Sequence, residues 1–344
     1  MKKLTRISLS VFIAIAWCAT DVFHLYGAFK ENIWSARSAA MGGAFMAVSN
    51  EAASFISFNP AGIAQLEMKE AGFGYTQKFM GLPNVTVGNM SACFAYPYIE
   101  KIGAFGVGYL SSDVSSLYGE QTIAVNYSVP LHKILGSKIV KVGKRQKEFP
   151  RLSLPVYAGL NLKMLSIKYN TSQDPMTSID PVFKNGGTGA GGLAADIGFL
   201  VKPSEQISAA LVVKNLLSPN VAIGKDSTGS TAASETVPME IGVGGAWRAG
   251  DKGVFEDITA ALDMVSRSPK DASSEFNWRL GAESWFGYHR YAARIGFNNT
   301  DMSLGGGLVR AFGPVELQID YGFTLPLSVS DNSGHHRISV TTRF

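Results

Sequence analysis

The sequence contains little charge, little cysteine and no long apolar run. Asp, Glu, Lys and Arg make up 17% of its 344 residues, whereas an average soluble protein has about 25%. The formal net charge is +4, which is too small and too scattered to indicate a nucleic-acid partner. No run approaches the roughly 18 consecutive apolar residues of a transmembrane helix. These absences argue against a nucleic-acid-binding protein and against a helical membrane protein.

Cysteine occurs twice, as Cys18 and Cys93. Cys18 lies in what we interpret as a secretory signal peptide, because a basic start precedes a short apolar stretch over residues 7–19. We assign residues 1–27 to this signal. Its cleavage site stays open, since small residues at positions 16 and 18 and a cut near Gly27 are both compatible with it. Without the signal Cys93 stands alone, so the mature chain has no internal disulfide.

Period-two alternation of apolar and polar residues is the strongest pattern in the chain. In the closing run, Ile338, Val340, Thr342 and Phe344 alternate with Arg337, Ser339, Thr341 and Arg343. Such alternation puts apolar side chains on one face of a strand and polar side chains on the other. Fourteen runs of this kind occur, over residues 70–80, 85–97, 103–111, 119–129, 154–169, 189–202, 206–215, 238–248, 254–265, 275–286, 288–298, 302–312, 315–325 and 336–344.

Both a β-sandwich around a dry core and a β-barrel in a membrane would show this alternation. Three features favour the barrel. The strands continue without a domain break, their polar face mixes opposite charges that can pair across a lumen, and aromatic residues cluster near the ends of runs, as at membrane interfaces. Spans of about 9–11 residues suit tilted membrane strands. We therefore predict an all-β membrane barrel of about 14 antiparallel strands over residues 70–344.

The connections between the runs alternate in length. Those at 203–205, 248–252, 287–288 and 313–314 are short, whereas those at 170–188, 216–237, 266–274 and 326–335 are long and polar. Outer-membrane barrels have short turns at one rim and long loops at the other. The connection over 130–153 falls on the short-turn side yet is long and basic, and the sequence offers no account of it. The apolar loop residues Leu216, Leu217, Val221 and Ile223 are candidates for a patch that collects hydrophobic ligand.

Residues 28–69 lack the two-residue rhythm and indicate short helices and tight turns. Their small-residue stretch over 36–48, followed by Asn59-Pro60-Ala61-Gly62, resembles the start of FadL-like outer-membrane barrels, and is most similar to the PorV/PorQ and UPF0164 branch. Strand segments around Arg279, Arg294 and His336 fit the same family. The resemblance implies a fourteen-stranded barrel whose N-terminal segment, residues 28–69, folds inside the lumen as a plug, or hatch.

The resemblance also suggests which residues form the plug and line the lumen. The expected plug motif comprises Arg37, Gly42, Gly43, Asn59, Pro60, Ala61 and Gly62. Proline fixes the backbone and glycine allows close approach, so the turn can pack tightly against the wall. A buried Arg37 needs an anionic partner, and Glu283, Glu316 and Asp320 are the candidates. Together with Arg279 and Arg294, these three carboxylates form the expected lumen charges. Phe344 is the expected assembly signal, since it ends the chain on the lipid-facing parity.

The resemblance implies passive uptake of hydrophobic small molecules, such as long-chain fatty acids, through the outer membrane of a diderm bacterium. Two alternatives stay open: a PorV-type component of a type IX-like secretion system, and a structural or adhesive surface protein. The expected partners are outer-membrane lipid, the barrel assembly machinery, a hydrophobic ligand and, for the first alternative, secretion-system proteins. No phosphate-binding loop, metal-ligand spacing or nucleophile motif occurs, so we expect no enzyme, metal or cofactor.

Overall fold

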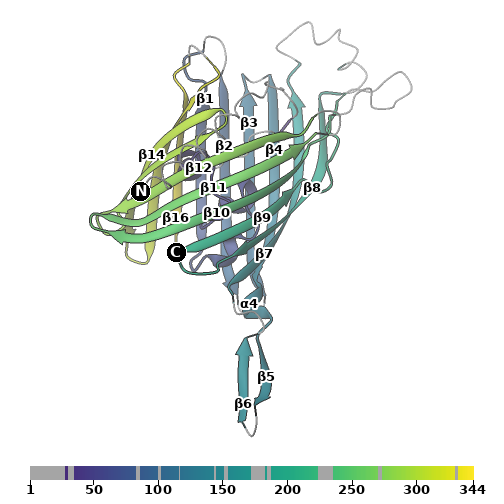
Figure 1. Ribbon diagram of the computed structural model, residues 1–344. Coiled ribbons are helices and arrows are strands. Elements are labelled where there is room, and N and C mark those ends of the chain that lie inside the picture. Colours follow the sequence, from purple (N-terminus) through teal and green to yellow (C-terminus); the bar gives the residue numbers. More distant parts are fainter. Residues whose placement is uncertain are drawn as a thin grey trace, which may run out of the picture.

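The chain folds into a closed β-barrel (Figure 1). The computed structural model describes residues 28–29, 35–82, 86–99, 102–115, 117–142, 145–150, 154–171, 183, 187–223, 235–269, 273–329 and 332–344, with the backbone alone at 98 and 137–150. The predicted signal peptide lies outside these residues. In the part of the chain so described, no helix has the length and apolar character needed to cross a membrane.

Fourteen antiparallel strands form the wall, which closes where the first strand pairs with the last. They are β1 (Glu70–Lys78), β2 (Val87–Ile99), β3 (Gly103–Val114), β4 (Tyr118–Pro130), β7 (Val156–Tyr169), β8 (Gly189–Val201), β9 (Ile207–Lys214), β10 (Met239–Lys252), β11 (Phe255–Ser268), β12 (Glu275–Phe286), β13 (Tyr291–Asn298), β14 (Asp301–Phe312), β15 (Val315–Pro326) and β16 (His335–Arg343). Each corresponds to one predicted run, so the predicted barrel and its strand number are confirmed.

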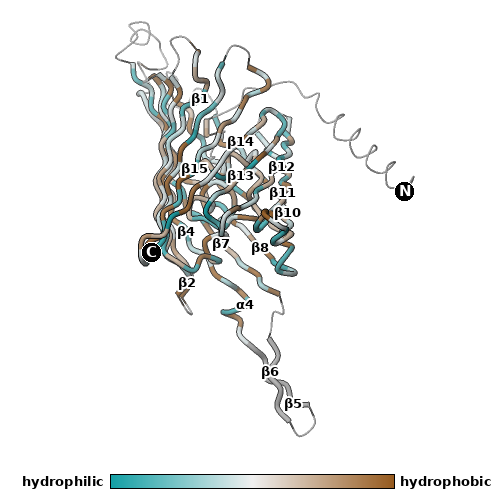
Figure 2. Tube along the Cα trace, turned by 90° about the vertical axis from the view of Figure 1, so that its left-hand side faces the viewer, coloured by the Kyte–Doolittle hydropathy of each residue, from teal (hydrophilic) through white to brown (hydrophobic). Residues whose placement is uncertain are grey.

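Alternate residues of each strand face opposite sides of the wall. On β13, Tyr291 and Ile295 are exposed, whereas Ala292 and Arg294 are buried. Figure 2 shows the resulting alternation of hydrophobic and hydrophilic residues along the strands. A wall with an apolar outer face and a polar inner face is the arrangement of a membrane barrel. Closure of the sheet lets each strand pair on both sides without water.

A hairpin occupies the connection over 130–153, where the sequence offered no element. A short helix, α4 (Leu131–Ile134), leads into β5 (Ser137–Val142), which pairs only with β6 (Arg145–Pro150). The hairpin projects away from the barrel at the end that carries the short turns (Figure 1). Ile139, Val140 and Val142 favour strands, but the surrounding lysines mask their alternation in the sequence.

The N-terminal segment, residues 35–69, lies within the ring of strands. It contains α2 (Ala36–Ala40), α3 (Ser54–Ser57) and the 3-10 helix η1 (Gly62–Gln65). Ser35 caps α2 by accepting a hydrogen bond at Oγ from the Ser38 amide, 3.1 Å away. Helix α2 packs against β13–β16, and η1 packs against β2, β3, β4 and β7. The segment therefore contacts opposite sides of the inner wall.

Among the described strands, the wall is interrupted beside β8, at the end that carries the long loops. β8 pairs with β9 only over residues 197–201, so residues 189–196 have no strand partner on that side. The chain after β9 covers this part of β8: the Leu216 amide donates to the Ala195 carbonyl at 2.9 Å, and Pro219 packs against Gly192. The β9–β10 connection thus takes the place of a strand.

An apolar cluster, which we call the loop-end cluster, lies on the inner side of this interruption. It comprises Ala28, Phe29, Leu165, Ile167, Ala194, Val221 and Val237. Leu216 and Leu217 are exposed, as the predicted collecting patch requires, but Val221 is fully buried. The patch prediction is therefore wrong for Val221, because the connection folds back and packs this side chain against β7 and β8.

Candidate functional site

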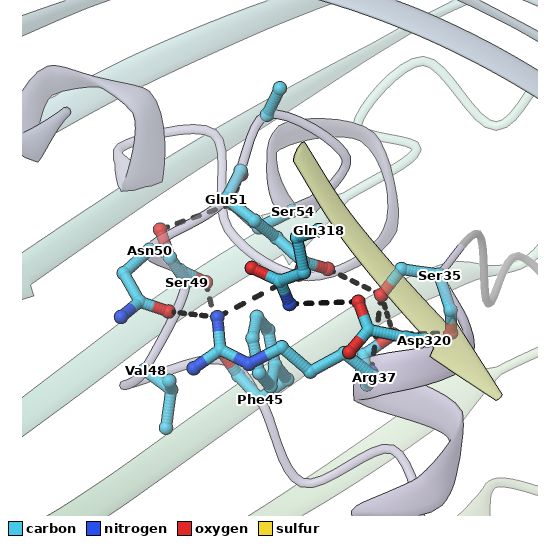
Figure 3. A network of polar contacts seen from close by, with 12 residues as sticks. Ser35, Arg37, Phe45, Val48, Ser49, Asn50, Glu51, Ser54, Gln318 and Asp320 are labelled. Carbon is cyan, nitrogen blue, oxygen red and sulfur yellow. Dashed lines mark hydrogen bonds and ion pairs between the residues drawn. The ribbon is translucent and has the colours of Figure 1, made fainter. Parts of the chain in front are cut away.

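Arg37 on α2 is the centre of a buried polar network between the N-terminal segment and the wall (Figure 3). Its guanidinium donates to Glu283 on β12, from Nε at 2.8 Å and from Nη2 at 2.6 Å, and to Asn50 Oδ1 at 2.9 Å. The ring of Phe45 lies 5.2 Å from the guanidinium carbon. Of the three carboxylates that the sequence left open, Glu283 is the direct partner.

The wall continues the network. Arg294 on β13 donates to Glu283 Oε2 at 2.5 Å and to Asp320 on β15 at 2.8 Å, and Gln318 donates to the other Asp320 oxygen at 2.7 Å. Two arginines therefore share one glutamate, while Asp320 balances the second arginine. Because all four ionic side chains are buried, removing one would leave an uncompensated charge.

The other two predicted lumen charges lie outside this network. Glu316 pairs with Arg343 on β16, which also pairs with Glu70 on β1. Arg279, which is half-buried, lies opposite Asp263 on the neighbouring strand β11. The inner face thus carries paired charges of both signs rather than a single charged surface.

Glu51 and Glu70 hold the loop between α2 and α3. Glu51 accepts a hydrogen bond from the Ser35 hydroxyl and lies 3.7 Å from Arg37 Nη1. Burial raises the pKa of Glu51 to about 7, although nearby Arg37 acts in the opposite direction. Glu70 accepts from the Ala52 amide at 2.5 Å. Both carboxylates are thus used to bind donors of the N-terminal segment.

The predicted Asn-Pro-Ala-Gly turn contacts the opposite side of the wall. Asn59 Nδ2 donates to the carbonyls of Met46, at 3.2 Å, and Phe199 on β8, at 3.1 Å. Its Oδ1 accepts from the Ala61 amide at 2.9 Å. The Pro60 carbonyl accepts from Asn126 Nδ2 on β4 at 3.0 Å. The side chain and backbone of the turn therefore tie it to two strands.

Gly42 and Gly43 have φ values of 63° and 78°, a conformation that favours glycine. Gly42 also lies directly against Gly296 on β13, where a Cβ built on either residue would overlap backbone atoms of the other side. Pro60 approaches Gly159 and Gly198 in the same way, and Gly62 packs on Ser49 and Ser54. Glycines of the wall thus provide the space that the segment fills.

Three wall residues that sequence analysis missed also bind the segment. Asp263 Oδ2 accepts the amides of Phe45 and Met46 at 2.8 and 2.9 Å. Asn161 on β7 donates to the Phe55 carbonyl at 2.7 Å, and Ser208 on β9 donates to the Ala47 carbonyl at 2.8 Å. The alternation in the sequence places these residues on the inner face, but their hydrogen-bond partners depend on how a distant segment folds.

A cavity of about 390 Å³ adjoins the segment, lined in part by Arg37, Glu70, Trp285, His289, Glu316 and Arg343. Its lining mixes both charges, which suits water better than an apolar ligand. Within the described residues, no group of three or more His, Cys, Asp or Glu side chains is arranged to hold a metal ion. The arrangement supports a blocked lumen rather than a reaction centre.

No protein-family model matches the chain, and no curated protein matches its sequence. Solved structures that share its fold include the following three. The toluene transporter TbuX of Ralstonia pickettii has a TM-score of 0.55 and 13% identity, over 92% of this chain and 98% of that one. The P. putida toluene transporter TodX has a TM-score of 0.53 and 11% identity, over 91% of this chain and 98% of that one. A Pseudomonas aeruginosa FadL homologue has a TM-score of 0.52 and 10% identity, over 90% of this chain and 98% of that one. TbuX and TodX are toluene transporters by name. At identities of 10–13% the likeness establishes the FadL-type fold alone.

Proposed function

We propose that this chain is an outer-membrane barrel that lets hydrophobic small molecules pass, as the FadL-type fold suggests. The loop-end cluster carries the proposal. Apolar side chains such as Leu165, Ile167 and Val221 gather inside the lumen. The ionic side chains of the Arg37 network pair with one another instead. These side chains are buried against Ala28 and Phe29, so a molecule from the loop side would bind here by displacing these two residues. It would then gain about 25 cal/mol for each Å² of apolar area removed from water.

In this proposal, the N-terminal segment acts as the plug. Its amides and carbonyls are held by Asp263, Asn126 and Asn161, and its one arginine by Glu283. A molecule can leave the loop-end cluster only when the plug shifts or when the wall opens. The interruption beside β8 offers a route of the second kind, since no strand ladder has to break over residues 189–196.

We infer that the cargo is neutral rather than anionic. Glu120 and Glu235 lie at the loop-end cluster, where they accept the amides of Phe29 and Ala28. Two carboxylates repel the headgroup of a fatty acid, whereas an uncharged hydrocarbon meets no such penalty. The names of TbuX and TodX as toluene transporters agree with this inference, which narrows the fatty-acid expectation from the sequence.

A cross-link tests the route. Cysteines at Gly192→Cys and Pro219→Cys, in a Cys93→Ser background, would join the β9–β10 connection to β8. Oxidation should stop uptake of labelled toluene by cells, and reduction should restore it in the same variant. A single-cysteine control away from the interruption, Gly245→Cys in the same background, should respond to neither treatment. Unchanged toluene uptake in the fully cross-linked protein would overturn the route, and faster uptake of oleate than of toluene would overturn the neutral cargo.

A second candidate is a docking role of the PorV/PorQ kind, favoured by the projecting β5–β6 hairpin. Residues 130–153 contain Lys133, Lys138, Lys141, Lys144, Arg145, Lys147 and Arg151 against the single acidic residue Glu148. An isolated two-stranded hairpin is only marginally stable in water, so a partner would stabilise it. Replacing residues 136–151 by a short turn should leave toluene uptake intact. Loss of secreted surface proteins in this variant would support the docking role, and normal secretion would contradict it.

A further inference from the structure

Ala28 and Phe29 are enclosed in the loop-end cluster, at 7% and 4% exposure. Their backbone nitrogens are bound by two carboxylates. The nitrogen of Ala28 donates to Glu235 Oε1 at 3.3 Å, and that of Phe29 donates to Glu120 Oε1 at 3.0 Å. Glu120 comes from β4 and Glu235 from the chain just before β10. The two carboxylates thus bind one dipeptide from β4 and from just before β10, and these two strands are separated in the ring by β7, β8 and β9.

In the part of the chain that the structure describes, no cationic side chain pairs with these two carboxylates. Besides the Phe29 amide, Glu120 accepts the hydroxyl of Tyr118 at 2.8 Å. Within the described residues, neither Glu120 nor Glu235 forms an ion pair with Lys, Arg or His. Two carboxylates beside an apolar cluster repel each other and favour a positive charge between them. An amide N–H supplies only a dipole there.

We propose that Ala28 is the first residue of the mature chain and that its α-ammonium group binds at this site, against Glu235 and beside Glu120. Cleavage after Gly27 would put a small residue at the last position of the signal, which is one of the two small positions of an A-x-A-like site; Leu25 occupies the other. The nitrogen already in contact with Glu235 would then carry a positive charge and three donors. Capture of an N-terminal amine is a known mode of peptide recognition.

This binding site anchors the start of the plug at the loop end of the lumen. The ammonium replaces a hydrogen bond in which only the acceptor is charged by an ion pair in which both groups are charged. Phe29 adds its ring to the loop-end cluster, so the first two residues are held by charge and by apolar packing. The inference rests on export of the chain, which belongs to the proposed function, but not on the identity of the cargo.

The first test is the N-terminal sequence and intact mass of the protein purified from the membrane. We expect the chain to begin at Ala28. A start at any other residue would overturn the proposal, while uptake assays on the same preparation would still report on the cargo separately. The start is read directly from the wild-type protein, so no variant has to fold.

The second test measures the rate at which acetic anhydride modifies the Ala28 α-amino group at pH 7, read on the N-terminal peptide by mass spectrometry. A paired, enclosed amine should react at least about tenfold slower in the folded barrel than in the urea-unfolded chain. Glu235→Gln should remove most of this protection, whereas Glu205→Gln, at an exposed residue of a short turn, should leave it unchanged. Equal rates in folded and unfolded wild type, or full protection in Glu235→Gln, would overturn the anchoring site.

Discussion

Arg37 of the N-terminal segment donates two hydrogen bonds to Glu283 on β12, at 2.8 and 2.6 Å, although the residues are 246 positions apart. Both are almost fully buried. This pair links the N-terminal segment to one strand of the surrounding wall. Arg294 and Asp320 extend the ion-pair network from β12 to β13 and β15. The N-terminal segment is therefore held in place by charged side chains that are buried inside the lumen.

Replacing Arg37 by Ala should destabilise the protein by about 3–5 kcal/mol, because Glu283 and Glu51 lose a buried partner. Urea unfolding in detergent micelles measures the loss. The matched control is Arg248→Ala, which breaks an ion pair with Asp257 whose side chains are 43% and 31% exposed, and should cost at most about 1 kcal/mol. Equal losses in the two variants would contradict a structural role for the buried pair.

Gly296→Ala should loosen the plug without preventing barrel assembly. Its new Cβ would overlap the backbone of Met41 and Gly42, which cannot move aside as a side chain can. Hydrogen exchange of the amides around residues 38–48 should become faster. Gly245→Ala provides the control, since a Cβ there meets nothing within 4 Å. The prediction is wrong if both variants exchange at the wild-type rate.

Replacing Asn59 and Pro60 together by Ala should change ligand uptake while leaving assembly intact. Asn59 loses its hydrogen bonds to Met46, Phe199 and Ala61, each worth about 1 kcal/mol. We expect lower toluene uptake in a barrel that still shows heat-modifiable migration in gels. Uptake at the wild-type rate by a correctly assembled double variant would contradict a role for this turn in uptake.

Deleting Phe344 should impair insertion into the membrane. Its backbone pairs with Lys69 through hydrogen bonds of 3.0 and 3.2 Å at the seam of the barrel, and its ring is half exposed on the outer face. Closure of the sheet removes the free edges that a membrane does not tolerate. The amount of folded protein in the membrane fraction measures the effect. Phe344→Tyr, which keeps an aromatic ring, should insert normally, and normal levels of the deletion variant would count against the assembly signal.

Stability should fall as pH rises through the range governed by Glu51. Burial raises the pKa of this carboxyl to about 7 in the folded chain, above its value of about 4.3 when unfolded. The folded state therefore binds more protons between these values, and stability decreases with pH there. Urea unfolding at pH 5 and pH 7.5 measures the difference. Glu51→Gln should reduce it, and an unchanged pH dependence in that variant would contradict the role of Glu51.

Period-two alternation was sufficient to predict the barrel because the side of the wall that a residue faces is fixed by its own strand. It gave every wall strand but not the β5–β6 hairpin, whose basic residues hide the alternation of Ile139 and its neighbours. Nothing local marks the β8–β9 interruption either, since residues 189–196 alternate like any paired strand.

The contacts of the N-terminal segment could not be predicted from the sequence, for a different reason. Arg37 could be given three candidate partners, but the choice of Glu283 depends on how the stagger of the closed sheet places β12 against α2. Asp263 shows the same limit. Its parity points inward, yet its role in binding the Phe45 and Met46 amides depends on a loop more than two hundred residues away.

Entry of labelled toluene into cells tests the central claim most directly, that this barrel lets neutral hydrophobic molecules cross the outer membrane. The comparison is between a host that lacks its own hydrocarbon barrels and the same host with this protein assembled in its outer membrane. We predict faster, saturable entry when the protein is present, and a return to the background rate when the β9–β10 connection is cross-linked to β8. Equal entry rates with and without the assembled protein would contradict the account.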